Sequence, residues 1–205
     1  MGKYFFIFQL AIVKNIKNTK ALVGLGLFLL TCMLIFAHLW EIAATKLGAT
    51  KLDPDHLLWY IALNQWVLIS IPDVHDDMEE DLKSGKLAYL LPRPISYLGS
   101  IFCEGLGTIV VNFTLLGFVA LLFSWWRTEI CPFDFFEFLI ISGLGLFACI
   151  VGMLFQMIIG ISAFWVREVT PCDWIWKKLL FAFGGLLLPL LAYPTWIQHI
   201  AYYTP

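Results

Sequence analysis

The sequence predicts an all-α integral membrane protein. Of its 205 residues, 60% are hydrophobic and only 14% are charged, whereas soluble domains carry about 45–50% apolar and about 25% charged residues. Several apolar runs are about 20 residues long, the length that a helix needs to cross a bilayer. The aromatic residues, 17% of the chain, suit helix ends that are anchored at membrane interfaces. We therefore expect one transmembrane domain over residues 1–205, with an N-terminal interfacial helix, about five spans and a C-terminal re-entrant helix.

The first 20 residues predict a helix that lies in the headgroup plane. Residues 4–16 are apolar around most of a helix circumference, but Gln9, Lys14 and Lys17 make one side polar. This pattern is typical of an amphipathic helix at a membrane surface. We expect an interfacial elbow helix within residues 1–20, and the alternative is a polar extension of the first span.

Five apolar segments are the expected transmembrane spans, and charged residues or prolines bound each of them. They cover residues 21–44, 57–71, 98–123, 135–166 and 179–191. The fifth is expected to start directly after Lys177 and Lys178. Residues 193–203 form a short amphipathic piece that cannot cross again. Because irregular backbone inside a membrane needs protein or water as a partner, we expect this piece to re-enter the membrane or lie on its surface.

The distribution of Lys and Arg orients the chain. Short cytoplasmic loops carry an excess of these residues. If the N-terminus is cytoplasmic, ten basic residues fall on the inner side and three on the outer side, so we expect this orientation. The inner ones are Lys3, Lys14, Lys17, Lys20, Lys83, Lys86, Arg93, Arg167, Lys177 and Lys178, and the outer ones are Lys46, Lys51 and Arg127.

A conspicuously charged stretch, residues 74–94, lies between the second and third spans. Its first half can form a helix with acids near the N-terminal end and with Glu79 and Lys83 paired at i,i+4. Gly85 is expected to end this helix, and the Pro-Arg-Pro sequence at residues 92–94 ends the short apolar turn that follows. We expect an ordered cytoplasmic element here, and the alternative is a solvated loop.

The run from Asp81 to Gly107, DLKSGKLAYLLPRPISYLGSIFCEGLG, resembles the segment between the second and third spans of ABC-2-type transporter permeases. The basic N-terminal helix, the stretch at residues 164–168 and the ending at residues 186–200 are also similar to that family. The resemblance covers nearly the whole chain, although the family normally has six spans and only five are expected here. The matching positions in the run are Gly85, Leu87, Leu91, Arg93, Pro94, Ile95 and Ser96.

The resemblance implies a permease subunit of an ATP-driven transporter, usually an exporter, in a bacterial cytoplasmic membrane. Two permease subunits, identical or different, would pair with two ATPase subunits that bind the ATP. The chain has no G-x-x-x-x-G-K-[ST] phosphate loop, so we expect no catalytic, cofactor or metal site in it. By the resemblance, the residues that contact the ATPase are Asp76, Asp77, Glu79, Glu80, Asp81, Lys83, Gly85, Lys86 and Arg93.

Three polar residues of the expected spans are candidate pathway or packing residues. Asn64 and Gln65 in the second span indicate a face turned toward protein rather than lipid. Glu104, early in the third span, is costly to leave unpaired there. We expect it to pair with Arg93 or Lys178 near the inner interface, or to face a substrate pathway.

Other interpretations stay open at this point. Asp53, Asp55 and His56 could bind a metal or could simply begin a helix, and His38 and Glu41 could line a path or reach the interface. A membrane-embedded enzyme and a scaffold without transport are the alternative functions. The formal net charge of −2 gives no indication of a nucleic-acid partner, and the apolar spans suit a lipid, a drug or a hydrophobic peptide as cargo.

Overall fold

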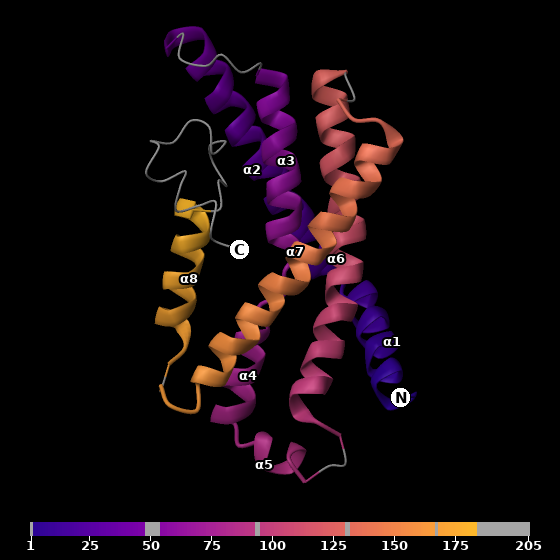
Figure 1. Cartoon of the computed structure of the whole chain (residues 1–205), viewed down its shortest axis with the longest axis vertical. Coiled ribbons are helices and arrows are strands. Elements are labelled where there is room, and N and C mark those ends of the chain that lie inside the picture. The colour runs from indigo at the N-terminus through magenta and orange to yellow at the C-terminus, as the bar shows by residue number, and fades with distance from the viewer. Residues whose placement is uncertain (1, 48–53, 93–94, 130–131, 167, 184–205) are drawn as a thin grey trace.

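The computed structural model describes residues 2–47, 54–92, 95–129, 132–166 and 168–183, and every regular element among them is a helix (Figure 1). This confirms the all-α fold. The helices are α1 (Gly2–Lys17), α2 (Thr19–Leu47), α3 (Pro54–Ser70), α4 (Val74–Lys83), α5 (Leu87–Leu90), α6 (Tyr97–Thr128), α7 (Phe135–Ser162) and α8 (Thr170–Phe183).

Four stretches in the described part of the chain are long and apolar enough to cross a membrane. They are Thr19–Leu39, Asp55–Lys83, Tyr97–Thr128 and Phe135–Ser162. Each overlaps one of the first four predicted spans, and the second also includes α4, beyond the predicted end at residue 71. Most of the fifth predicted span, residues 179–191, and the predicted re-entrant piece, residues 193–203, lie outside the described residues.

The helix that carries the start of the fifth predicted span begins nine residues before that span. Helix α8 begins at Thr170, so Lys177 and Lys178 lie inside it rather than before it. Pro171 stands in its first turn, where a proline costs no backbone hydrogen bond. Asp173 pairs with Lys177 at i,i+4 at a distance of 2.8 Å. These local features let the helix begin at Thr170, before the purely apolar residues that start at Leu179.

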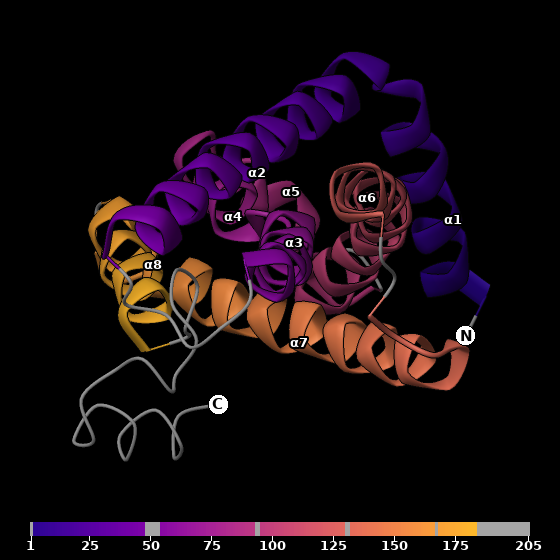
Figure 2. The same ribbon diagram turned by 90° about the horizontal axis from the view of Figure 1, so that it is seen from above.

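The N-terminal helix is separate from the first span, so the alternative of one continuous helix is wrong. Between α1 and α2 the chain turns at Asn18, and Figure 2 shows the two helices meeting at a corner. Helix α1 packs along the start of α6. A Cβ atom at Gly107 would lie 2.7 Å from the Cβ of Ala11 and 2.9 Å from the main-chain oxygen of Phe8. The close approach of the two helices therefore depends on a glycine at this position.

Helices α3 and α6 form the centre of the bundle, and α1, α2, α7 and α8 surround them (Figure 2). The most apolar window of α6 is 50% buried, against 11% for α2 and 17% for α7. The indole N–H of Trp66 donates to the main-chain oxygen of Phe113 at 2.7 Å, and the two rings lie 4.3 Å apart. A Cβ atom at Gly117 would meet the Trp66 ring at 2.5 Å. The ring of Trp66, its hydrogen bond to Phe113 and the absence of a side chain at Gly117 thus fix the contact between α3 and α6.

Helix α7 crosses the bundle diagonally, from the loop after α6 to the end that carries α4 and α5 (Figure 1). A capping box fixes its start, because Asp134 and Glu137 each accept a hydrogen bond from the other's backbone N–H. Its last turns reach α4. The end of the bundle that carries α4 and α5, called the α4 end below, therefore gathers elements from most of the chain.

Candidate functional site

The predicted cytoplasmic element is an ordered helix, turn and short helix, as the sequence indicates. Asp76 and Asp77 lie in the first turn of α4 and Lys83 lies in its last turn, which suits the helix dipole. The turn that follows needs Gly85, whose φ of 71° is left-handed. Helix α5 continues directly from that turn. Within the described residues, the alternative of a solvated loop is wrong.

One face of α4 is buried against α7. The buried residues are Val74, His75, Met78 and Glu79. A Cβ atom at Gly160 of α7 would lie 2.5 Å from the sulfur of Met78 and 3.3 Å from the Cα of His75. The glycine therefore lets α4 come within backbone contact of α7, and the two helices are positioned as one unit.

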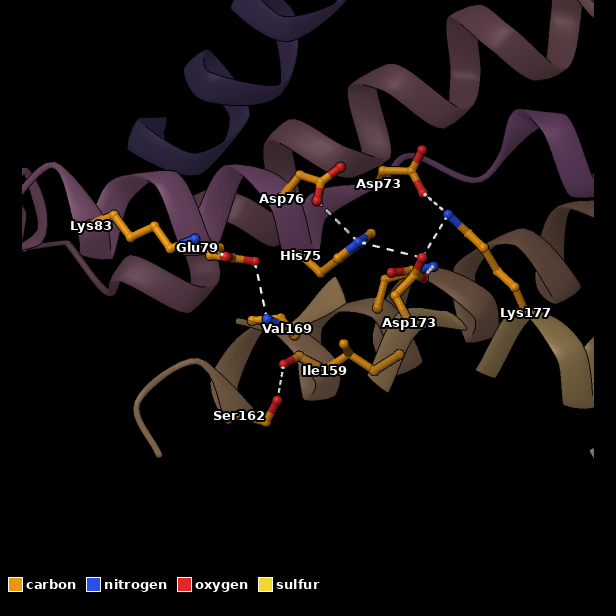
Figure 3. Close-up of polar contacts among 11 residues, drawn as sticks. Asp73, His75, Asp76, Glu79, Lys83, Ile159, Ser162, Val169, Asp173 and Lys177 are labelled. Carbon is orange, nitrogen blue, oxygen red and sulfur yellow. Dashed lines mark hydrogen bonds and ion pairs between the residues drawn. The ribbon is translucent and has the colours of Figure 1, made fainter. Parts of the chain in front are cut away.

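Glu79 holds this unit to the loop before α8. It pairs with Lys83, as the spacing predicts, and it accepts a hydrogen bond from the backbone N–H of Val169 at 3.3 Å. Figure 3 shows the Glu79 side chain pointing from α4 toward Val169. Since Val169 is completely buried, Glu79 satisfies a donor that water does not reach.

A second group of charges joins α4, α7 and α8. We call it the polar junction: Asp73, His75, Gln156, Asp173 and Lys177. Asp173 lies at its centre and is 4% exposed. It accepts from Lys177 at 2.8 Å and from the amide nitrogen of Gln156 at 3.2 Å, and Nε2 of His75 lies 3.7 Å from it. The Lys177 ammonium also contacts Asp73 at 3.1 Å (Figure 3).

The sequence analysis missed the polar junction. Asp73, His75 and Asp173 offer ligand atoms within 4.8 Å of one another, a geometry that could hold a metal ion. In this structure the Lys177 ammonium supplies positive charge to both carboxylates. Burial acts to lower the pKa of Lys177, but its contacts with Asp173 and Asp73 outweigh this effect and raise it. Lys177 therefore stays protonated, and the i,i+4 spacing of Asp173 and Lys177 was the only signal of the group in the sequence.

An open cavity of about 340 Å³ separates α4 from α1 and α6. We call it the acidic cavity. Lys14 pairs with Glu104 at 2.8 Å, and Lys86 pairs with Asp81 at 2.6 Å. The hydrogen bonds to Glu104 and to Asp81 raise the pKa values of Lys14 and Lys86, respectively. The charged residues that line the cavity are Lys14, Asp77, Glu80, Asp81, Lys86 and Glu104.

The acidic cavity carries uncompensated negative charge. Both of its lysines are already paired. Asp77 and Glu80 make no ion pair with any other described residue and are exposed. This part of α4 is therefore the face that remains available to a partner.

The predicted contact residues fall into two sets. Asp76, Asp77, Glu80, Lys83, Gly85 and Lys86 are exposed. Glu79 is buried and Asp81 is partly buried, where it also accepts from the hydroxyl of Tyr97 at 3.2 Å. Arg93 lies outside the described residues. Among the described residues Glu104 pairs with Lys14, which α1 places beside α6, and not with Lys178, while the expected pairing with Arg93 is not tested.

The other predicted polar residues have local partners. Asn64 donates to the main-chain oxygen of Tyr60 at 3.0 Å, and Gln65 is 8% exposed and faces protein, as predicted. At the far end of the bundle, His38 contacts Glu41 at 3.1 Å. Glu41 also pairs with Arg127. Of the three residues considered as a metal site, Asp53 lies outside the described residues and Asp55 lies in the first turn of α3.

The fold and the site together define a multi-pass helical membrane protein with the charged helix α4 and the short helix α5 at one end. Residues 57–205 match the family described as ABC-2 family transporter protein. The chain belongs to this family, which consists of transporter membrane subunits that are not themselves catalytic. No match was found among curated proteins or among solved structures.

Proposed function

We propose that the chain is the permease subunit of an ATP-driven exporter and that α4 and α5 contact a separate ATPase subunit. Membership of the ABC-2 transporter family supports this function. ATP would be bound and hydrolysed by the partner, so the chain itself needs no cofactor. Its own part is to convert movement of the partner into movement of helices.

The observation that carries the proposal is the way α4 is anchored. Only the short break at residues 71–73 separates it from α3, and its buried face is packed on α7 at Gly160. Its exposed face carries Asp76, Asp77 and Glu80. A force applied to this face would therefore move α3 and α7 together, because packed helices shift as rigid bodies.

The proposal includes an orientation and a second subunit. The α4 end would face the cytoplasm of a bacterium, with the N-terminus on the same side, as the excess of basic residues indicates. A second permease, identical or related, would complete the transport pathway. The exposed apolar side chains of α2, such as Val23, Leu27 and Ile35, suit contact with lipid or with such a subunit.

Charge reversal on the exposed face of α4 tests the proposal. We expect the double variant Asp77→Lys and Glu80→Lys to lose the ATPase when the tagged chain is purified in gentle detergent from its native membrane. Both residues are exposed, so insertion and elution volume should not change. The partner is identified by its mass and by ATP hydrolysis in the purified complex.

Asp55→Lys, at the opposite end of the bundle, is the matched control and should retain the ATPase. Recovery of the ATPase with the double variant at the level of the unmodified chain would contradict the assignment of α4 as the contact. Absence of any ATPase from the unmodified complex would instead contradict the permease function itself.

A further inference from the structure

A second cavity, of about 450 Å³, lies between α2, α3, α7 and α8. This volume is within the range of small-molecule sites, about 300–1,000 Å³. We call it the α2–α8 cavity. Most of its wall is apolar, and it includes Leu25 and Phe28 of α2, Leu68 and Ile69 of α3, and Leu180 and Phe181 of α8.

The polarity of the cavity changes from one end to the other. From the end of α3 into the break that follows it, the lining residues run from Leu68 to Ile71 and then to Asp73. Along α8 they run from Phe181 back to Lys178 and Lys177. The ion pair between Lys177 and Asp73 joins the two polar ends. The cavity is therefore apolar toward the middle of the bundle and charged toward the α4 end, the polarity of an amphiphile that lies in one membrane leaflet.

Gln156 adds a buried polar side chain to the charged end of the cavity. It lines the cavity and is only 4% exposed. Its amide nitrogen donates to Asp173, but its Oε1 atom is buried and has no hydrogen-bond partner in the described structure. Because Oε1 has no accessible surface, Gln156 ties the charged end of the cavity to Asp173 and leaves the contacts with a ligand to other groups.

The charge at the polar end favours an anion. Lys177 is neutralised by Asp73 and Asp173. Lys178 has no carboxylate within ion-pair distance in the described part of the chain, and its Nζ atom lies 5.9 Å from the centre of the Trp174 ring. One cation therefore remains for an anionic group that enters the cavity.

We propose that the α2–α8 cavity binds an anionic amphiphile. Its apolar chain would lie against α2 and α3, and its anionic group would contact Lys178. The site is proposed from its own geometry. Only the role of the amphiphile as cargo rests on the proposed transport function.

Photolabelling tests the site. The probe is hexadecanoic acid that carries a diazirine on its chain, added to the purified full-length chain without nucleotide. We expect labelling to map by mass spectrometry to peptides that contain Leu25, Phe28 or Phe181. Unlabelled hexadecanoate should compete, and hexadecylamine, which has the same chain but a positive head, should compete at least tenfold less well.

Three variants sharpen the result. Lys178→Gln should weaken competition by hexadecanoate about tenfold, the effect of losing one charge-assisted contact. Leu25→Trp should block labelling by filling the apolar end. Lys20→Gln, which removes an exposed lysine of α2 outside the cavity, is the matched control and should bind normally. An unchanged elution profile in detergent shows that each variant is folded.

Equal competition by hexadecanoate and hexadecylamine, or unchanged binding to Lys178→Gln, would overturn the proposal. The source of the ligand is decided separately in the complex with the ATPase. Labelling that falls when ATP is added identifies cargo, and labelling that persists identifies a resident bilayer lipid. Because the binding assay uses no nucleotide, its outcome is independent of whether the chain transports.

Discussion

At the residue scale, Glu79 has a different role from the acids beside it. Asp76 and Glu80 face outward, whereas Glu79 is 8% exposed and joins Lys83 to the backbone of Val169. A hydrogen bond to a charged group contributes more than a neutral one. Glu79 therefore stabilises the contact between α4 and the loop before α8, and only its neighbours can contribute directly to a partner surface.

The variant Glu79→Gln tests this role. It removes the negative partner of Lys83 and weakens the acceptor for the backbone N–H of Val169. We therefore expect the free energy of unfolding to fall by about 1–3 kcal/mol. Glu80→Gln, one position along the same helix, should change it by less than about 0.5 kcal/mol. Thermal unfolding in detergent measures both. Identical unfolding midpoints for the two variants would mean that the Val169 contact contributes nothing.

The sequence predicted residue contacts only where one helix determines them. The pairing of Glu79 with Lys83 and the turn at Gly85 follow from spacing along α4. Lys14 and Glu104 are 90 residues apart, and their contact depends on α1 lying beside α6. Depth in the membrane suggested a basic partner for Glu104, but depth alone does not say which helix is adjacent.

At the scale of elements, glycines determine which helices approach closely. Gly107 allows α1 to pack on α6, because a Cβ atom there would meet Ala11 and the main-chain oxygen of Phe8 at less than 3 Å. Gly143 of α7 has nothing within 4 Å of the same position. The two glycines have the same intrinsic helix propensity, and only their neighbours differ.

Replacing each glycine by alanine separates propensity from packing. Gly107→Ala should lower the free energy of unfolding by about 1–3 kcal/mol, because α1 must move away from α6. Gly143→Ala should raise it by up to about 1 kcal/mol, the gain in helix propensity. Detergent unfolding of the two variants measures the difference. A stabilising Gly107→Ala would show that α1 does not pack against α6.

Length and hydropathy predicted the long helices well and α8 less well. The four apolar spans stand out in the sequence because each contains an 18-residue window of high hydropathy with at most two charged residues. Helix α8 combines Asp173, Lys177 and Lys178 with apolar residues, so its first half was assigned to a loop. A helix whose charges are paired with other helices cannot be recognised from its own composition.

At the scale of the whole molecule, two levels of charged residues enclose a layer without charges. In α6 no charged residue occurs between Glu104 and Arg127, a length of about 33 Å at 1.5 Å per residue. This is close to the thickness of the hydrocarbon core, about 30 Å. The ion pairs that mark the two levels are Lys14–Glu104 and Lys177–Asp73 at the α4 end, and Arg127–Glu41 at the other.

The two levels turn the proposed orientation into a prediction about protease access. If the α4 end is cytoplasmic, trypsin should cleave after Lys86, in the exposed turn before α5, in inside-out vesicles but not in right-side-out vesicles. Cleavage after Arg127, at the opposite end of α6, should show the reverse preference, because a layer of about 30 Å separates the two sites. Mass spectrometry of the fragments identifies each cut, and vesicles opened with detergent, in which both sites are accessible, are the control. Cleavage after Lys86 in intact right-side-out vesicles would place α4 and α5 outside the cell, where no ATPase could reach them.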